Sequence, residues 1–269
     1  MRALPGLVVL LAALTTGAGA PDLAITDTHI HYSRNSWSLY SPQAVLSILA
    51  AAGITRAFVS STPDEGTVRL YGLAPERIVP VLRPYREEGD AGRWYQDPGV
   101  VPYLEERLAR GGYRGIGEFH LEGSAARSGV VRQVSALAAR HRLFVHCHCD
   151  VEAVEVLLGL GGPVPVLWAH AGMSVGPAAV GRLLDAFPRL RVELALRSDV
   201  APGGQLDPAW QSLFLRHADR FMVGTDTWIP SRWADLADVQ RGTRAWLRQL
   251  PADVAERIAS GNAERLAAR

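Results

Sequence analysis

Eight short apolar segments recur along the chain, and helix-like segments lie between most of them. Each apolar segment is rich in Val, Ile, Leu or Phe and is bounded by turn residues, which is typical of buried β-strands. The expected strands are residues 23–31, 54–60, 77–83, 113–119, 142–148, 164–170, 190–196 and 220–226. Strands that alternate with helices pair in parallel, because each helix returns the chain to the start of the next strand.

The helix-like segments complete this pattern. The first extends from Ser41, a candidate N-cap, to Ala52, with Pro42 in the first turn. The other expected helices are residues 100–110, 128–140, 151–159, 177–186, 207–217 and 232–249. Eight strands with intervening helices in about 250 residues indicate an α/β fold, a single-domain (β/α)8 TIM barrel. An open doubly wound sheet is the alternative, but no Gly-x-Gly-x-x-Gly motif opens a first helix to support it.

The first 20 residues predict export. Arg2, the apolar run 7–14 and the small residues 18–20 have the form of a secretory signal peptide with an A-x-A cleavage site. The apolar run is too short to span a bilayer, and no Cys follows the cleavage site to carry a lipid anchor. We therefore expect a signal peptide at 1–20, a barrel domain at 21–269, and a periplasmic or secreted protein without a membrane anchor.

The composition excludes several classes of partner and of catalytic group. The net charge is +1 and no basic run is present, so nucleic acid is not an expected partner and a small-molecule substrate fits better. All 28 basic residues are Arg, which excludes a Schiff-base lysine and a carboxylated lysine that bridges two metals. Cys147 and Cys149 are spaced i, i+2 with poor expected disulfide geometry, so we predict two free thiols. Nothing in the sequence indicates the oligomeric state.

Polar residues concentrate where the expected strands end, which is the active-site face of a TIM barrel. Six of the eight histidines lie at these ends, whereas His141 and His217 fall in helical segments. The strand-end residues are His29, His31, Glu118, His120, His146, His148, His170 and Asp226. A single buried His is more often a hydrogen-bonded structural residue, and Asp at such a junction is often a helix cap. Five strand ends with imidazole or carboxylate groups together favour one common site.

His29 and His31 point to the same face of the first strand, because successive side chains alternate. In a barrel that face is the interior, where two imidazoles in a low dielectric need a cation as partner. Asp226 comes from the last strand and lies beside the first one when the barrel closes. Nitrogen and oxygen ligands with an open position suit Zn²⁺ best, with Mn²⁺ or Fe²⁺ as alternatives.

Several motifs together resemble a known family. They are D-x-H-x-H at 27–31, G-x-G-E at 115–118, F-V-H at 144–146, W-A-H at 168–170, G-T-D at 224–226 and G-N-A-x-R-L at 261–266. In this combination the chain resembles the amidohydrolase superfamily of metal-dependent barrel hydrolases, specifically its amidohydrolase-2 branch. The motifs extend over essentially the whole mature chain, but they do not specify a substrate.

The resemblance implies roles for individual residues. His29 and His31 are ligands, a fifth-strand His is a third, and Asp226 is both a ligand and the proton acceptor. His146 and His148 both point inward, so either can be that third ligand, and the strand-then-His form favours His146. His170 is then a further ligand, or it positions the water or substrate.

Glu118 leaves the number of ions open, at one or two. Many superfamily members carry a bridging carboxylated Lys on the fourth strand, which this chain lacks. TatD-like hydrolases carry a Glu there and can bind two metals, whereas the amidohydrolase-2 branch favours one.

The function that follows is metal-assisted hydrolysis of an ester, lactone or amide bond, since a bound divalent ion lowers the pKa of water toward 7. Arg83 and Arg197 are candidates for binding a substrate carboxylate through their planar guanidinium groups. His120 and Trp228 are further candidates for substrate contact. Ion pairing at the barrel rim for each Arg, and packing for Trp228, are the alternative interpretations.

Three other functions are alternatives to metal-assisted hydrolysis. Relatives in the same branch use these ligands for non-oxidative decarboxylation or hydration. A TatD-like nuclease would need a basic groove, and the near-neutral charge argues against it. A periplasmic metal- or ligand-binding protein without turnover is the third, although Asp226 as a potential base disfavours it.

Overall fold

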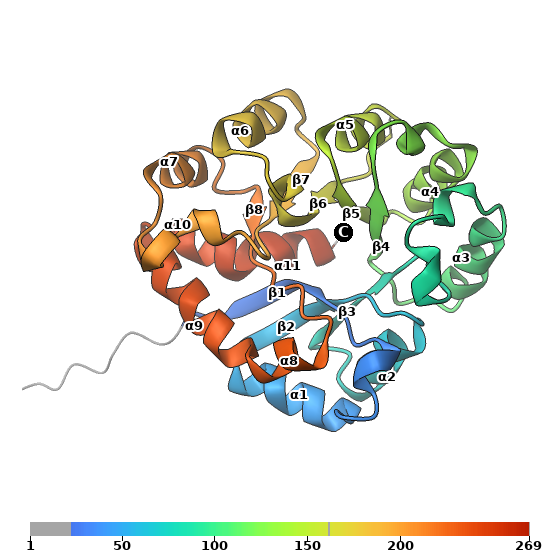
Figure 1. The fold of residues 1–269 in the computed structure, drawn as a ribbon, viewed down its shortest axis with the longest axis horizontal. Helices are drawn as coiled ribbons and strands as arrows, with labels where there is room; N and C mark the ends of the chain where they lie inside the picture. Colours follow the sequence, from blue (N-terminus) through green and yellow to red (C-terminus); the bar gives the residue numbers. More distant parts are fainter. Residues whose placement is uncertain (1–22, 161, 269) are drawn as a thin grey trace, which may run out of the picture.

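The protein is a parallel eight-stranded barrel surrounded by helices (Figure 1), seen in a computed structural model that describes residues 23–160 and 162–268. Neighbouring strands pair in the order β1 to β8. Their bounds are β1 Ile25–Ile30, β2 Ile54–Val59, β3 Ile78–Leu82, β4 Gly115–Leu121, β5 Phe144–Cys149, β6 Val166–Trp168, β7 Leu190–Glu193 and β8 Phe221–Met222. The predicted TIM barrel is thus confirmed. The last three strands are shorter than the sequence predicted, because the chain leaves the sheet soon after Trp168, Glu193 and Met222.

Closure brings the first strand beside the last. The backbone N–H of Thr28 donates to the carbonyl of Val223 at 3.0 Å, and that of His31 donates to Thr227 at 2.9 Å. An isolated parallel bridge also joins Ile30 to Thr227. The carboxyl ends of β1 and β8 therefore lie side by side, so residues from both ends can share one metal ion.

The helices follow the strands as the sequence predicts, with three omissions and one division. They are α1 Pro42–Ala51, α2 Glu65–Leu73, α3 Val100–Leu108, α4 Gly129–Arg140, α5 Val151–Gly159, α6 Pro177–Ala186, α7 Pro208–Arg216, α8 Pro230–Ala234, α9 Leu236–Leu247, α10 Ala252–Glu256 and α11 Asn262–Ala267. Ser41 caps α1 by accepting a hydrogen bond from Ala44 N at 3.2 Å. Helices α2, α10 and α11 were not predicted. Two glycines weaken the helical pattern of α2, and α10 and α11 are only 5 and 6 residues long. The expected helix 232–249 is divided into α8 and α9 at Asp235.

One end of the barrel is filled by its own C-terminal helix. Ala263, Leu266 and Ala267 of α11 form a buried cluster with six side chains of five strands: Phe58, Val79, Val81, Phe144, Leu167 and Met222. In Figure 1 α11 crosses the end of the barrel beside β1 and β8. Apolar packing closes this end, so the polar residues at the strand ends occupy the opposite one.

The prediction of two free thiols was wrong. Cys147 and Cys149 form a disulfide, with their Cα atoms 5.4 Å apart. Both lie on the face of β5 that packs into the helix layer, and both are buried. Residues two apart on a strand point the same way, and this Cα separation falls within the range that a disulfide requires.

The predicted signal peptide lies outside the described residues. Within residues 23–160 and 162–268, no helix has the length and apolar character needed to cross a membrane.

Candidate metal centre

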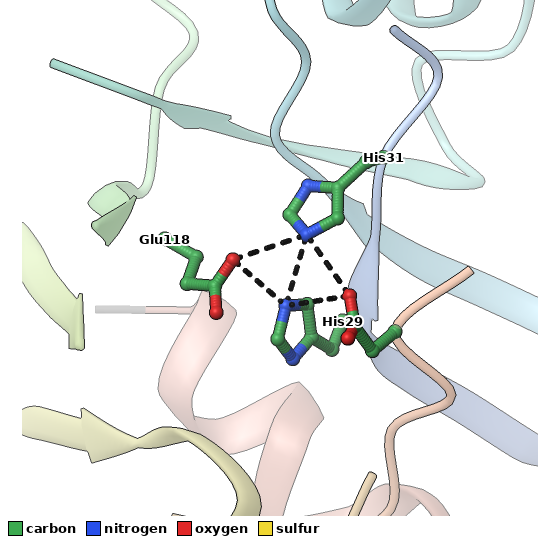
Figure 2. Close-up of side chains that lie close together, drawn as sticks. His29, His31 and Glu118 are labelled. Atoms are coloured by element: carbon green, nitrogen blue, oxygen red, sulfur yellow. Dashed lines mark hydrogen bonds and ion pairs between the residues drawn. The ribbon is translucent and has the colours of Figure 1, made fainter. Parts of the chain in front are cut away.

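His29, His31, Glu118 and Asp226 converge at the carboxyl ends of β1, β4 and β8. The two Nε2 atoms of His29 and His31 are 3.0 Å apart, and Oε2 of Glu118 lies 3.2 Å from each of them. Oδ1 of Asp226 lies 3.4 Å from Nε2 of His29 and 3.3 Å from that of His31. Figure 2 shows both imidazoles and Glu118 directed toward one point. One ligand atom from each of the four residues lies within 4.8 Å of all the others.

The hydrogen bonds of the Nδ1 atoms determine which nitrogen of each neutral imidazole carries the proton. Nδ1 of His29 lies 3.0 Å from a carboxylate oxygen of Glu193, and Nδ1 of His31 lies 2.5 Å from the Ser60 carbonyl. Both partners only accept hydrogen bonds, so each Nδ1 carries a proton and each ring, when neutral, directs an Nε2 lone pair inward. Two such lone pairs at 3.0 Å and two carboxylate oxygens favour a positive charge between them, either a proton on His29 or a metal cation. A divalent cation would coordinate all four donor atoms. The two imidazole nitrogens and two carboxylate oxygens therefore form a donor set that fits such an ion.

The charges of the site agree with that assignment. Burial opposes a charge on His29, but the carboxylates of Glu118, Asp226 and Glu193 outweigh it and raise the pKa of His29 well above its usual value. Burial would raise the pKa of Glu118 and of Asp226, yet the charge on His29 holds both well below their ordinary values. The centre is anionic and strongly attracts positive charge.

Three more imidazoles surround this group. Nδ1 of His148 lies 3.2 Å from Oε1 of Glu118, and Nε2 of His170 lies 3.7 Å from the same oxygen. Among the described residues, buried Nε2 atoms of His146 and His170 have no hydrogen-bond partner. Burial, followed by the charge on His29, lowers the pKa of His146 well below its usual value, so its imidazole is neutral. His146 and His148 both remain candidates for the fifth-strand ligand.

Glu193 is a site residue that the sequence analysis missed. Its fully buried carboxylate at the end of β7 accepts hydrogen bonds from His29 Nδ1 at 3.0 Å, His170 N at 2.7 Å and Ala195 N at 2.6 Å. Burial alone would raise the pKa of Glu193, but the charges on His170 and His29 lower it to about 2. The available signal was a lone acidic residue between apolar residues of a buried strand.

The two arginines occupy different environments. Arg83 donates to the backbone carbonyl of Glu118 at 2.9 Å and to its Oε2 at 3.1 Å, and it also borders the pocket over the site. Arg197 donates to Asp199 through two nitrogens and to the backbone carbonyls of His170, Ala171 and Val175. Arg83 thus supports the metal centre directly. Arg197 holds the loop that carries His170, and it is not among the residues that line the pocket.

A pocket of about 330 Å³ opens over the centre. Its lining residues are His31, Arg83, Glu118, His120, His148, Leu196, Asp226 and Trp228. His120 and Trp228, both predicted to contact substrate, are therefore placed at the pocket. Burial lowers the pKa of His120 to about 4, so its imidazole is neutral near pH 7.

Glu193→Gln should weaken metal binding without removing a ligand. The amide would set its NH₂ group against the backbone N–H of either Ala195 or His170, and the orientation of His29 would suffer. Loss of such a supporting carboxylate typically costs about 10–100-fold in metal affinity. Competition with a chromogenic chelator measures the change. Glu155→Gln, on the exposed side of α5, is the control and should bind metal like the parent, and equal affinities for the two variants would contradict the role of Glu193.

Comparison with known proteins agrees with this geometry. Residues 89–266 match the family described as Amidohydrolase. A probable 2-pyrone-4,6-dicarboxylic acid hydrolase from Acinetobacter baumannii, solved with citric acid bound, has a TM-score of 0.61 at 13% identity, with 91% of this chain and 99% of that one covered. An amidohydrolase from Burkholderia multivorans with bound Zn has a TM-score of 0.56 at 15% identity and the same coverage.

A third structure, YJJV, a TatD homolog from Escherichia coli K12, has a TM-score of 0.63 at 18% identity, with 90% of this chain and 97% of that one covered. At these identities the three structures establish a shared fold. No curated protein sequence matches the chain. Because the family match extends over more than half of the chain, the protein belongs to the amidohydrolase family of metal-dependent hydrolases.

Proposed function

We propose that the protein hydrolyses an ester, lactone or amide bond of a small molecule at the centre formed by His29, His31, Glu118 and Asp226. The observation that carries this proposal is the convergence of four lone-pair atoms below an open pocket. A divalent cation held there supplies Lewis-acid activation of water and of the carbonyl under attack. Zn²⁺ suits the nitrogen and oxygen donors best, with Mn²⁺ and Fe²⁺ as alternatives.

Asp226 is placed to take the proton of the attacking water. Its carboxylate borders the pocket, and its side chain is 13% exposed, whereas that of Glu118 is 3% exposed. Arg232 donates to the backbone carbonyl of Asp226 at 2.8 Å and so holds the segment that carries it. A carboxylate that faces both the ligand atoms and the pocket can accept a proton and deliver it to the leaving group.

His170 is better suited to hold a cation than to contact substrate. Its side chain is fully buried, and Nδ1 lies 3.1 Å from the Ala195 carbonyl, which fixes the proton there. When the ring is neutral, Nε2 therefore carries a lone pair on the side of Glu118. Because Oε2 of Glu118 faces His29 and His31 while Oε1 faces His148 and His170, this carboxylate can serve either one or two ions.

Elemental analysis of protein that has never contacted an affinity-column metal, followed by a substrate panel, tests the proposal. We expect one or two transition-metal ions per chain, and turnover of an ester, lactone or amide. Two ions would make Glu118 a bridging ligand. Chains that neither hold nor respond to Zn²⁺ or Mn²⁺ would contradict the proposed centre. Release of CO₂ from an unsaturated acid without hydrolysis would identify a decarboxylase, and metal binding without turnover would identify a binding protein.

We also propose that the protein is exported and that residues 1–20 are removed. The charged start, apolar run and Ala18-Gly19-Ala20 support this proposal, as does the Cys147–Cys149 disulfide, since disulfides persist mainly in oxidising compartments. Mass spectrometry of the extracytoplasmic protein should find Pro21 or a nearby residue first. A chain retaining Met1 in that fraction would contradict cleavage.

A further inference from the structure

Leu196 combines a strained backbone conformation with an exposed side chain at the pocket over the metal centre. It follows β7 with a φ of 61°, a left-handed backbone conformation that branched side chains rarely adopt. Its side chain buries little in return, because 45% of the residue is exposed. Backbone strain of this kind concentrates at binding sites and ligand clamps, where the strained residue contacts something other than the protein core.

Trp228 lies at the same pocket, on the segment that follows β8. It is 47% exposed, and its backbone carbonyl accepts a hydrogen bond from Asn35 Nδ2 at 3.1 Å. Both Leu196 and Trp228 line the pocket whose floor includes buried Glu118 and His31. The pocket thus combines a polar, buried floor with two large apolar side chains that are half exposed to solvent.

The charge of the pocket favours a neutral substrate. Arg83 is the one arginine among the lining residues that the structure describes, and its guanidinium already donates to the carbonyl and carboxylate of Glu118. A substrate carboxylate would have to share the guanidinium of Arg83 with Glu118, because the described lining residues include no other arginine. Apolar contact with Leu196 and Trp228 is the interaction that the pocket still offers.

We propose that Leu196 and Trp228 form an apolar clamp that binds an aromatic or branched aliphatic group of an uncharged ester or amide. The clamp holds this group while the scissile carbonyl lies over the metal centre. This inference rests on the proposed hydrolytic function and adds a substrate class to it.

Met173 provides a matched control. Its φ is 60° and it is 46% exposed, nearly the same values as for Leu196. It follows β6 and is not among the residues that line the pocket. Truncation of Met173 therefore reproduces the loss of a strained, exposed apolar side chain without altering the clamp.

The experiment compares Leu196→Ala, Trp228→Ala and Met173→Ala with the parent, all in the metal-loaded form. The substrates are the benzyl and methyl forms of an acetate ester and of an acetamide, together with a malonate monoester. We expect the parent to prefer the benzyl forms, and kcat/KM for them to fall about tenfold in each clamp variant, because small apolar differences in a pocket are worth at least this factor. The methyl substrates should change less than twofold, and Met173→Ala should match the parent.

Calorimetric binding of phenylacetone and acetone separates the clamp from the reaction, since neither ketone has a bond to hydrolyse. Phenylacetone should bind the parent more tightly than acetone does, and Leu196→Ala should remove most of the difference. If no ester, lactone or amide is hydrolysed but this binding pattern appears, the hydrolytic function is wrong and the clamp stands. If hydrolysis occurs but Leu196→Ala behaves like Met173→Ala, or if the malonate monoester is preferred, the clamp is overturned.

Discussion

Asp226→Asn should lower the turnover of any substrate by about 10² or more while the barrel remains folded. The amide keeps the shape and one oxygen that faces Nε2 of His29 and His31, so metal binding should weaken only in part. It cannot accept a proton near neutral pH, and general-base assistance is typically worth about 10²–10⁴-fold in rate. Steady-state kinetics at saturating metal measures the loss, and circular dichroism checks the fold.

The control for this variant is His141→Gln. His141 ends α4, on the helical layer rather than at the strand ends, and the change should leave most activity intact. If metal-saturated Asp226→Asn turned over substrate as fast as the parent, Asp226 would not be the base, and the proposed mechanism would be wrong.

Gly117→Ala should destabilise the folded protein by at least about 3 kcal/mol, the upper range for single substitutions. Gly117 precedes Glu118 on β4 with a φ of 138°, which disfavours any side chain. A Cβ atom there would lie 2.1 Å from the carbonyl oxygen of His146 on β5, and that oxygen belongs to backbone that cannot rotate away. The denaturant midpoint of unfolding measures the change in the free energy of unfolding.

Gly242→Ala is the matched control for this prediction. Gly242 lies on an exposed turn of α9, and a Cβ atom would have no neighbour within 4 Å. Alanine there should stabilise the protein by about 1 kcal/mol, because it restricts the unfolded chain and favours the helix. Equal midpoints for the two variants would show that β4 and β5 can separate at this point without cost.

The barrel could be predicted because buried parallel strands leave a clear pattern of apolar runs between helices. The ends of these strands were harder to place. The second helix was missed because Gly66 and Gly72 weaken its pattern, although Gly66 is required where a Cβ would lie 1.9 Å from the Tyr32 carbonyl. Tertiary contact, which the local sequence does not record, decided this element.

Strand alternation and barrel closure were enough to predict that His29, His31 and Asp226 come together, as they do in the structure, whereas Glu118 was a candidate whose role was left open. The sequence did not reveal which residues hold these side chains in place. The role of Glu193 depends on the exact end of β7, and the pairing of Arg83 with Glu118 depends on side-chain geometry between neighbouring strands. Free thiols were predicted for Cys147 and Cys149 because an i, i+2 pair on a strand has poor disulfide geometry, but the two residues do form a disulfide, with Cα atoms 5.4 Å apart.

The closure of the barrel between β1 and β8 also determines when the protein can acquire its metal. Thr28 and Val223, which share a backbone hydrogen bond, are 195 residues apart in the sequence. The two histidines of β1 therefore meet Asp226 only after the last strand has been synthesised and paired. A chain without its last strand has the histidines and Glu118 but not Asp226, and it should bind metal more weakly. Metal uptake therefore reports the completion of folding, and the ion bound is one supplied by the compartment in which the whole chain folds.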